Sequence, residues 1–205
     1  MKTGDVQTVN SRNTAGNNNQ ITVNLHTRIA FIALFAALTA AGAFIAIPIG
    51  PVPIVLQNLF AVLSGLVLGP IYGTASVGLY LLAGFLGFPV FAGGTGGIAR
   101  FAGPTGGYLI GYLLAAFIAG FISGKTEQGE KIPLTKNIAA VIAGFLIVYL
   151  PGIAWLKISR DLTWKTALIA GLIPFIIGDV LKGTAAILIA PRLRRLAADF
   201  LFRKK

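Results

Sequence analysis

The sequence predicts an all-α membrane protein: a polytopic bundle of six transmembrane helices with both termini in the cytoplasm. Three observations lead to this fold class. Of the 205 residues, 56% are hydrophobic and only 11% are charged, whereas a soluble domain carries about 25% charged residues. The apolar residues are grouped in blocks of roughly 16 to 25 residues, the length that crosses a bilayer core. The 17 Lys and Arg residues gather at the ends of these blocks, with Lys182 as the exception.

Six apolar blocks are separated by residues that interrupt helices. The turn over 48–53 holds three prolines and a glycine, which end the first block because proline lacks the N–H that a helix needs. A Gly69-Pro70 pair marks a tight reversal after the second block, and a glycine-rich loop over 88–104 follows the third. The predicted blocks cover about 29–48, 54–69, 71–87, 105–123, 137–156 and 166–190.

The distribution of positive charge predicts the orientation. Six crossings place the two termini on one side of the membrane, together with the connections at 69–70 and 124–136. That side carries 12 of the 17 Lys and Arg residues, and the opposite side carries four. Positive residues accumulate on the cytoplasmic side, so we expect both termini in the cytoplasm of a bacterium or archaeon. We divide the chain into a polar, disordered tail over 1–27, a membrane domain over 28–191 and a basic cytoplasmic tail over 192–205.

Several function classes are excluded by composition. The net charge of +11 is compatible with a nucleic-acid partner, but the basic residues flank apolar blocks and form no soluble basic face. The chain has no cysteine and a single histidine, His26, in its polar N-terminal region, so we expect no metal site. It contains no nucleophile–base pair, carboxylate dyad or nucleotide-binding motif. We therefore expect a plasma-membrane protein that is no enzyme and has no cofactor and no nucleic-acid partner.

Asp179 and Lys182 are the ionisable acid and base that lie inside an apolar block. Their i, i+3 spacing places them on one face of a helix. A lone charge at the bilayer centre costs about 2.5–3.5 kcal/mol on insertion scales, so both residues need partners. One interpretation is a structural ion pair, and the other is a ligand site that faces the interior of the bundle. We favour the ligand site, because ionisable residues within membranes are usually functional.

Arg100 is the one cation between the third and fourth blocks, in a glycine-rich segment that runs from Gly93 to Gly107. Glycines allow the backbone to approach a ligand closely or to fold into tight turns. The segment lacks the glycine spacings of nucleotide-binding loops. These residues alone are compatible both with a ligand-binding loop and with a flexible outer connection.

Small residues recur every four positions in the first block, at Ala33, Ala37 and Ala41. This spacing forms one ridge along a helix, and small residues let two helices approach closely within a membrane. Packing inside the same chain and docking on a partner both fit the pattern. From the residues alone, packing inside the chain is favoured.

Four sequence motifs together point to a known family. They are Gly50-Pro51-Val52-Pro53-Ile54 followed by Gln57, Gly87-Phe88-Pro89-Val90-Phe91 with Gly93 and Gly94, Gly103-Pro104-Thr105-Gly106-Gly107-Tyr108, and Gly178-Asp179-xx-Lys182. With these motifs the chain resembles the BioY family, the substrate-binding S components of energy-coupling factor transporters for biotin. The resemblance runs from Ile29 to about Arg195 and leaves out the N-terminal tail.

The resemblance implies six helices that capture biotin near the outer surface of the membrane. It also implies two kinds of protein partner, a transmembrane coupling protein (the T component) and two cytoplasmic ATPases. The alanine ridge is similar to the surface by which such subunits dock on the coupling protein, which reverses the preference for internal packing. The ligand-contacting residues that it implies are Arg100, Asp179 and Lys182, with Tyr108, Gly93, Gly94 and Gln57 beside them.

The chemistry of biotin fits these residues. An ionised Asp179 accepts the two N–H groups of the ureido ring, and the valerate carboxylate pairs with a cation, either Arg100 or Lys182. The sequence does not decide between the two cations. The alternative function is a stand-alone secondary carrier for a small organic anion. It is less favoured, because Asp179 is the single acid inside an apolar block and no inverted repeat is visible.

Overall fold

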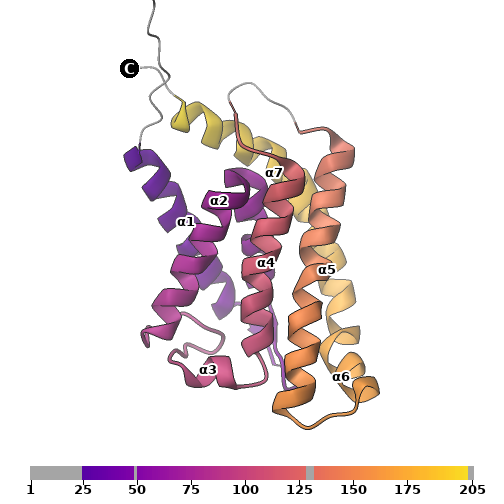
Figure 1. Cartoon of the computed structure of the whole chain (residues 1–205). Coiled ribbons are helices and arrows are strands. Elements are labelled where there is room, and N and C mark those ends of the chain that lie inside the picture. Colours follow the sequence, from indigo (N-terminus) through magenta and orange to yellow (C-terminus); the bar gives the residue numbers. More distant parts are fainter. Residues whose placement is uncertain (1–24, 49, 128–131, 203–205) are drawn as a thin grey trace, which may run out of the picture.

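The computed structural model describes residues 25–48, 50–127 and 132–202, and in these residues the fold is an all-α membrane bundle (Figure 1). The long helices are α1 (Leu25–Phe44), α2 (Gln57–Phe85), α4 (Gly106–Ser123), α5 (Leu134–Ser159) and α7 (Ile176–Leu201). The short elements are α3 (Ala99–Ala102), α6 (Trp164–Gly171), the 3-10 turn η1 (Ile173–Phe175), and the strands β1 (Ala46–Ile47) and β2 (Ile54–Val55).

Five helical stretches of the described chain are long and apolar enough to cross a membrane: α1, α2, α4, α5 and the stretch from α6 through α7. Their outer faces carry large apolar side chains. Leu150 of α5 is 69% exposed and Ile177 of α7 is 78% exposed. A bilayer solvates such side chains, whereas water would not. The predicted class of an all-α, multi-pass membrane bundle is therefore confirmed.

The predicted reversal at Gly69-Pro70 lies inside α2. Gly69 has φ +79° and ψ −179°, which is not helical. Across this reversal the Ser64 hydroxyl donates to the Gly73 carbonyl at 3.1 Å, although nine residues along a straight helix span about 13.5 Å. The helix thus consists of two antiparallel arms, 57–68 and 70–85. They measure about 18 Å and 24 Å, shorter than a full membrane crossing.

Two predicted boundaries at the N-terminal side differ from the structure. The first helix begins at Leu25, inside the stretch predicted as a disordered tail, and ends at Phe44 rather than at 48. It ends early because the chain enters β1, which pairs antiparallel with β2 across the proline-rich turn. The remainder of the predicted tail, residues 1–24, lies outside the described residues.

The predicted sixth block is not one continuous helix. The chain forms α6, breaks at Leu172 and turns through η1 before α7 begins. Pro174 explains the break, because its ring removes a helical N–H and clashes with the preceding turn. The last helix also continues beyond 190 to Leu201, so residues 192–201 are helical. Their predicted place in the cytoplasm stays a prediction.

The bundle has two distinct ends. At the terminal end lie the start of α1, the Gly69 reversal, the last turn of α4 and the last turn of α7 (Figure 1, top). At the loop end lie the β1–β2 hairpin, α3 and α6 (Figure 1, bottom). Between the ends α4 packs between α2 and α5. Small residues permit this close packing: a Cβ on Gly111 would lie 2.7 Å from the Val148 carbonyl oxygen of α5.

Candidate ligand-binding site

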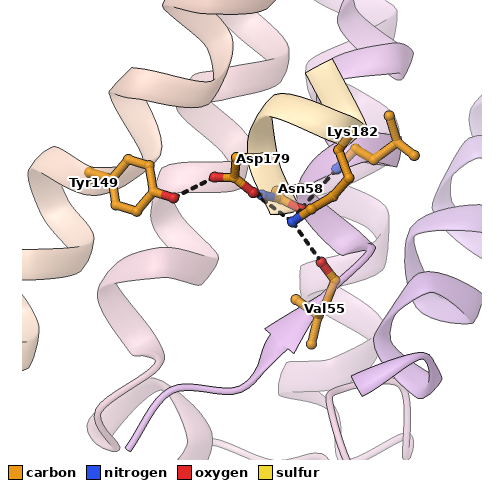
Figure 2. Close-up of polar contacts among 6 residues, drawn as sticks. Val55, Asn58, Tyr149, Asp179 and Lys182 are labelled. Carbon is orange, nitrogen blue, oxygen red and sulfur yellow. Dashed lines mark hydrogen bonds and ion pairs between the residues drawn. The ribbon is translucent and has the colours of Figure 1, made fainter. Parts of the chain in front are cut away.

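Lys182 is buried in the bundle and is fully engaged in hydrogen bonds (Figure 2). Its ammonium lies 2.6 Å from Asp179 Oδ1. It also donates to Asn58 Oδ1 at 3.0 Å and to the Val55 carbonyl at 3.1 Å. An ammonium has three N–H donors, so these three acceptors use all of them.

Asp179 is held by residues from two other helices. Its Oδ1 accepts a hydrogen bond from the Asn58 amide at 2.9 Å, and its Oδ2 accepts one from the Tyr149 hydroxyl. Because η1 interrupts the chain, Asp179 lies in the first turn of α7, where the helix dipole favours a negative charge. The result is a neutral polar network that joins α2, β2, α5 and α7 within apolar surroundings (Figure 2).

A first small cavity lies beside Arg100 at the loop end. Gln57 and Tyr108 line it, together with residues of the hairpin and of the loop before α3. Arg100 is half-buried and makes one long contact, from its guanidinium to the Ala92 carbonyl at 3.5 Å. Gln57 donates to the Tyr80 hydroxyl, and Tyr108 donates to the Gly171 carbonyl at 2.8 Å. The last bond ties the start of α4 to the end of α6.

A second small cavity lies beside the polar network, lined by Asn58, Tyr149, Lys182 and others. The two cavities are contiguous, because they share five lining residues: Val52, Pro53, Val55, Tyr108 and Tyr112. Each leaves about 20 Å³ for the centres of water molecules, which is room for one water. Together they form a path with a cation at each end and tyrosines in the middle.

Most of the predicted site residues come together here. Arg100, Gln57 and Tyr108 line the first cavity, and Lys182 lines the second. Its partner Asp179 belongs to the network but faces a groove between α5 and α7, with a volume of about 320 Å³. That groove is lined mainly by apolar residues.

Two predicted residues, Gly93 and Gly94, line neither cavity. Both have positive φ, 76° and 65°, a conformation that glycine adopts at little cost. A Cβ on Gly93 would meet nothing within 4 Å. In this structure they shape the loop before α3, and their contact with a ligand stays a prediction.

The sequence analysis missed Asn58, Tyr149 and Tyr112, which complete the site. One signal was available for the first two. Asn58 is a polar amide inside an apolar block, and Tyr149 carries a hydroxyl in the middle of another. A hydroxyl or amide buried in an apolar region needs a hydrogen-bond partner, and the Asp179–Lys182 pair was the nearest candidate.

The alanine ridge of α1 points away from the bundle. Ala33, Ala37 and Ala41 are exposed, whereas the neighbouring Ala36 and Ala43 are buried against the other helices. The ridge therefore does not pack inside the described bundle. A docking role for it stays a prediction.

A multi-pass helix bundle with a charge-compensated polar network and contiguous cavities defines a ligand-binding membrane protein. Comparison with known proteins identifies the family. The family model described as "BioY family" matches residues 13–199, so nearly the whole chain is covered. The chain belongs to the BioY family.

Similar proteins agree over nearly their full lengths. A probable biotin transporter BioY of Pyrococcus horikoshii is 45% identical over 81% of this chain and 95% of its own. A biotin transporter BioY of Thermotoga maritima is 41% identical over the same shares. The crystal structure of an S-component for biotin from an ECF-type ABC transporter is 34% identical and superposes with a TM-score of 0.74. It covers 87% of this chain and 96% of its own.

Proposed function

We propose that this chain is the biotin-binding S component of an energy-coupling factor transporter. The observation that carries the proposal is the pair of contiguous cavities between Arg100 and the Asp179–Lys182 network. The relatives are named as biotin transporters and the similar structure as an S-component for biotin. This agrees with the prediction that the chain is not an enzyme. Biotin would lie along the path, with its ureido ring at one end and its carboxylate at the other.

The hydrogen bonds favour Arg100 as the partner of the biotin carboxylate. All three donors of Lys182 already have acceptors. The guanidinium of Arg100 has five N–H donors and makes a single long contact to a carbonyl. A carboxylate beside Arg100 gains a charge-assisted, two-pronged pair. To pair with Lys182, the biotin carboxylate would first have to displace the carboxylate of Asp179.

The ureido ring fits the opposite end. Asn58 and Tyr149 line the second cavity and offer both donors and acceptors. Asp179 lies behind them, and it accepts an N–H group of the ring when Asn58 or Tyr149 gives up its bond to the carboxylate. The N–H groups and the carbonyl of the ring replace some of the hydrogen bonds within the network. Each polar group of the network therefore keeps a hydrogen-bond partner when biotin is bound. The tyrosines between the ends, Tyr108 and Tyr112, provide flat apolar surfaces for the thiophane ring and the alkyl chain.

Biotin binding requires the loop end to open. Pockets for small ligands are typically about 300–1,000 Å³, and the two cavities hold about one water each. The β1–β2 hairpin and the loop before α3 line the first cavity through Val52 and Phe91. We infer that these two segments move outward when biotin enters, while the helices that carry Tyr149 and Lys182 stay in place.

The remaining features follow from this assignment. The two arms of α2 count as separate passes, which gives six transmembrane segments with both termini in the cytoplasm. Biotin then enters from outside at the loop end. The exposed ridge at Ala33, Ala37 and Ala41 docks on the coupling protein, and two cytoplasmic ATPases supply the energy. The support is the exposure of the ridge on α1 and the family to which the chain belongs.

Two measurements test the function. Titration of the purified chain with biotin should show saturable binding at one site per chain. Uptake of biotin by cells should require the coupling protein and the ATPases. A chain that binds no biotin would refute the proposal. Full uptake without the ATPases would favour the stand-alone carrier instead.

A further inference from the structure

A further cavity lies at the terminal end, away from the candidate biotin site, and it is larger than the groove between α5 and α7 and than either biotin cavity. It has a volume of about 660 Å³. The start of α1, the Gly69 reversal of α2, the residues that follow α4 and the last residues of the chain's final helix form its walls. Two cations, Arg28 and Lys125, lie at its rim with one acid, Glu127.

Arg28 is held in place by an aromatic side chain rather than by an acid. Its guanidinium carbon lies 4.8 Å from the centroid of the Tyr72 ring, and one of its nitrogens donates to the Tyr72 hydroxyl. In the described part of the chain the one ion pair is that of Lys182 with Asp179. Arg28, Lys125 and Glu127 thus form no ion pair with one another, and both cations keep donors for an anion.

The floor of this cavity is apolar. Leu68 and Leu201 are buried and form it, whereas Pro70 and the exposed Ile71 line the cavity nearer the surface. A soluble anion would use the rim and leave this floor in contact with water. A molecule with a negative head and an apolar body would cover both. The cavity lies where helices long enough to cross a membrane end, and in a bilayer such helix ends are expected near the lipid headgroups.

The walls of the cavity are fixed by a neighbouring buried residue. Arg194 donates to the carbonyls of Leu66 and Gly124 at 3.0 Å and 3.1 Å, and Thr126 donates to the Val67 carbonyl at 2.6 Å. These bonds join α7, the reversal of α2 and the segment after α4. The cavity therefore lies between segments that hydrogen bonds join to one another.

We propose that this cavity binds one anionic phospholipid, with the phosphate between Arg28 and Lys125 and the first part of an acyl chain on the apolar floor. The charge of this end agrees with such a ligand. It is the end that the sequence predicts to face the cytoplasm, where anionic lipids attract basic residues. The proposal does not rest on biotin as the substrate, because none of its residues lines either biotin cavity.

Native mass spectrometry of the purified chain tests the proposal. The chain is incubated with phosphatidylglycerol, with phosphatidylcholine, and with inorganic phosphate. We expect one retained phosphatidylglycerol per chain, weak retention of phosphatidylcholine and no protection by phosphate. The double variant Arg28→Gln/Lys125→Gln should retain phosphatidylglycerol about thirty-fold less, since each cation near an anionic headgroup contributes about a factor of five.

A matched variant at the other end of the bundle serves as the control. Arg160→Gln/Lys165→Gln removes two cations beside α6, and it should retain phosphatidylglycerol like the wild type. Biotin titration of both double variants should be unchanged, which shows that they fold. Equal retention of the two lipids, equal loss in both double variants, or displacement of the lipid by phosphate alone would overturn the proposal.

Discussion

Two buried cations on α7, Lys182 and Arg194, have different kinds of partner. Their residues are 6% and 3% exposed, so burial does not distinguish them. Two of the three acceptors of Lys182 are side chains, the carboxylate of Asp179 and the amide of Asn58, and the third is the Val55 carbonyl. Arg194 donates to backbone carbonyls at the ends of two other helical segments, including those of Leu66 and Gly124.

The hydrogen-bond partners of a buried cation, rather than its degree of burial, therefore indicate whether it serves ligand binding or the fold. Side chains can exchange one hydrogen-bond partner for another, so the network around Lys182 is able to accept a ligand. Carbonyls at a helix end have no other donor within their helix, so the hydrogen bonds of Arg194 cap the ends of these helical segments. We infer that Lys182 serves the binding of biotin and that Arg194 serves the fold.

Replacement of Arg194 should have the largest effect on stability. Arg194→Met keeps an apolar stem but removes the donors to Leu66 and Gly124. Hydrogen bonds from a charged donor contribute about 1.5–3 kcal/mol each, so we expect a loss of at least about 3 kcal/mol. Thermal unfolding in detergent measures it. Arg195→Ala is the control, because Arg195 is exposed. Equal melting temperatures for the two variants would refute the structural role of Arg194.

Asp179→Asn should weaken biotin binding by about 1.5–3 kcal/mol, the size of a hydrogen bond to a charged group. It also leaves Lys182 without its counter-ion, and such a buried charge destabilises the fold. The double variant Asp179→Asn/Lys182→Gln should therefore recover the melting temperature but not the affinity. Calorimetric titration and thermal unfolding of both variants separate the two effects. Wild-type affinity in either folded variant would remove Asp179 from the site.

Arg100→Ala should weaken biotin by about 10- to 100-fold, since a charge-assisted hydrogen bond is lost. It should hardly change the binding of biotin amide, which carries no charge for Arg100 to pair with. Competition titrations with the acid and the amide give both values. An equal loss of affinity for the acid and the amide would indicate that Lys182, rather than Arg100, pairs with the carboxylate.

Ala37→Trp should have the smallest effect on the isolated subunit. Its side chain is exposed on α1, so biotin binding and melting temperature should stay near those of the wild type. Co-purification with the coupling protein and the ATPases should be lost, because a bulky residue prevents close helix contact. The adjacent Ala36→Trp is the matched control: Ala36 is buried, and overpacking should lower its stability. Intact complexes with Ala37→Trp would refute the docking role.

The sequence predicted the features that depend on local rules. Gly69-Pro70 predicted the reversal because glycine accepts the positive φ that the turn needs and proline suits the first position of a new helix. Asp179 and Lys182 stood out because charge is rare in an apolar block. Their i, i+3 spacing placed them on one helix face, and the ion pair of the structure was one of the two interpretations that this spacing allowed.

Other features could not be predicted because they depend on packing between distant segments. Asn58 and Asp179 are 121 residues apart in the sequence, and nothing local pairs them. The break before α7 was also missed. Pro174 was visible, but a proline inside an apolar block either kinks a helix or ends it. The helix beyond 190 was read as a tail because its basic residues resembled a flank, whereas Arg194 turns inward to cap other helices.

A structure of the chain with biotin bound would show whether biotin lies between Arg100 and the Asp179–Lys182 network. We expect the carboxylate to lie within hydrogen-bond distance of Arg100, at about 2.7–2.9 Å. The ureido ring should contact Asp179 and Asn58, and the β1–β2 hairpin should have moved away from Tyr108. Arg194 should keep its bonds to the carbonyls of Leu66 and Gly124. Biotin in the groove between α5 and α7, or at the terminal end beside Arg28, would contradict the assignment of the site.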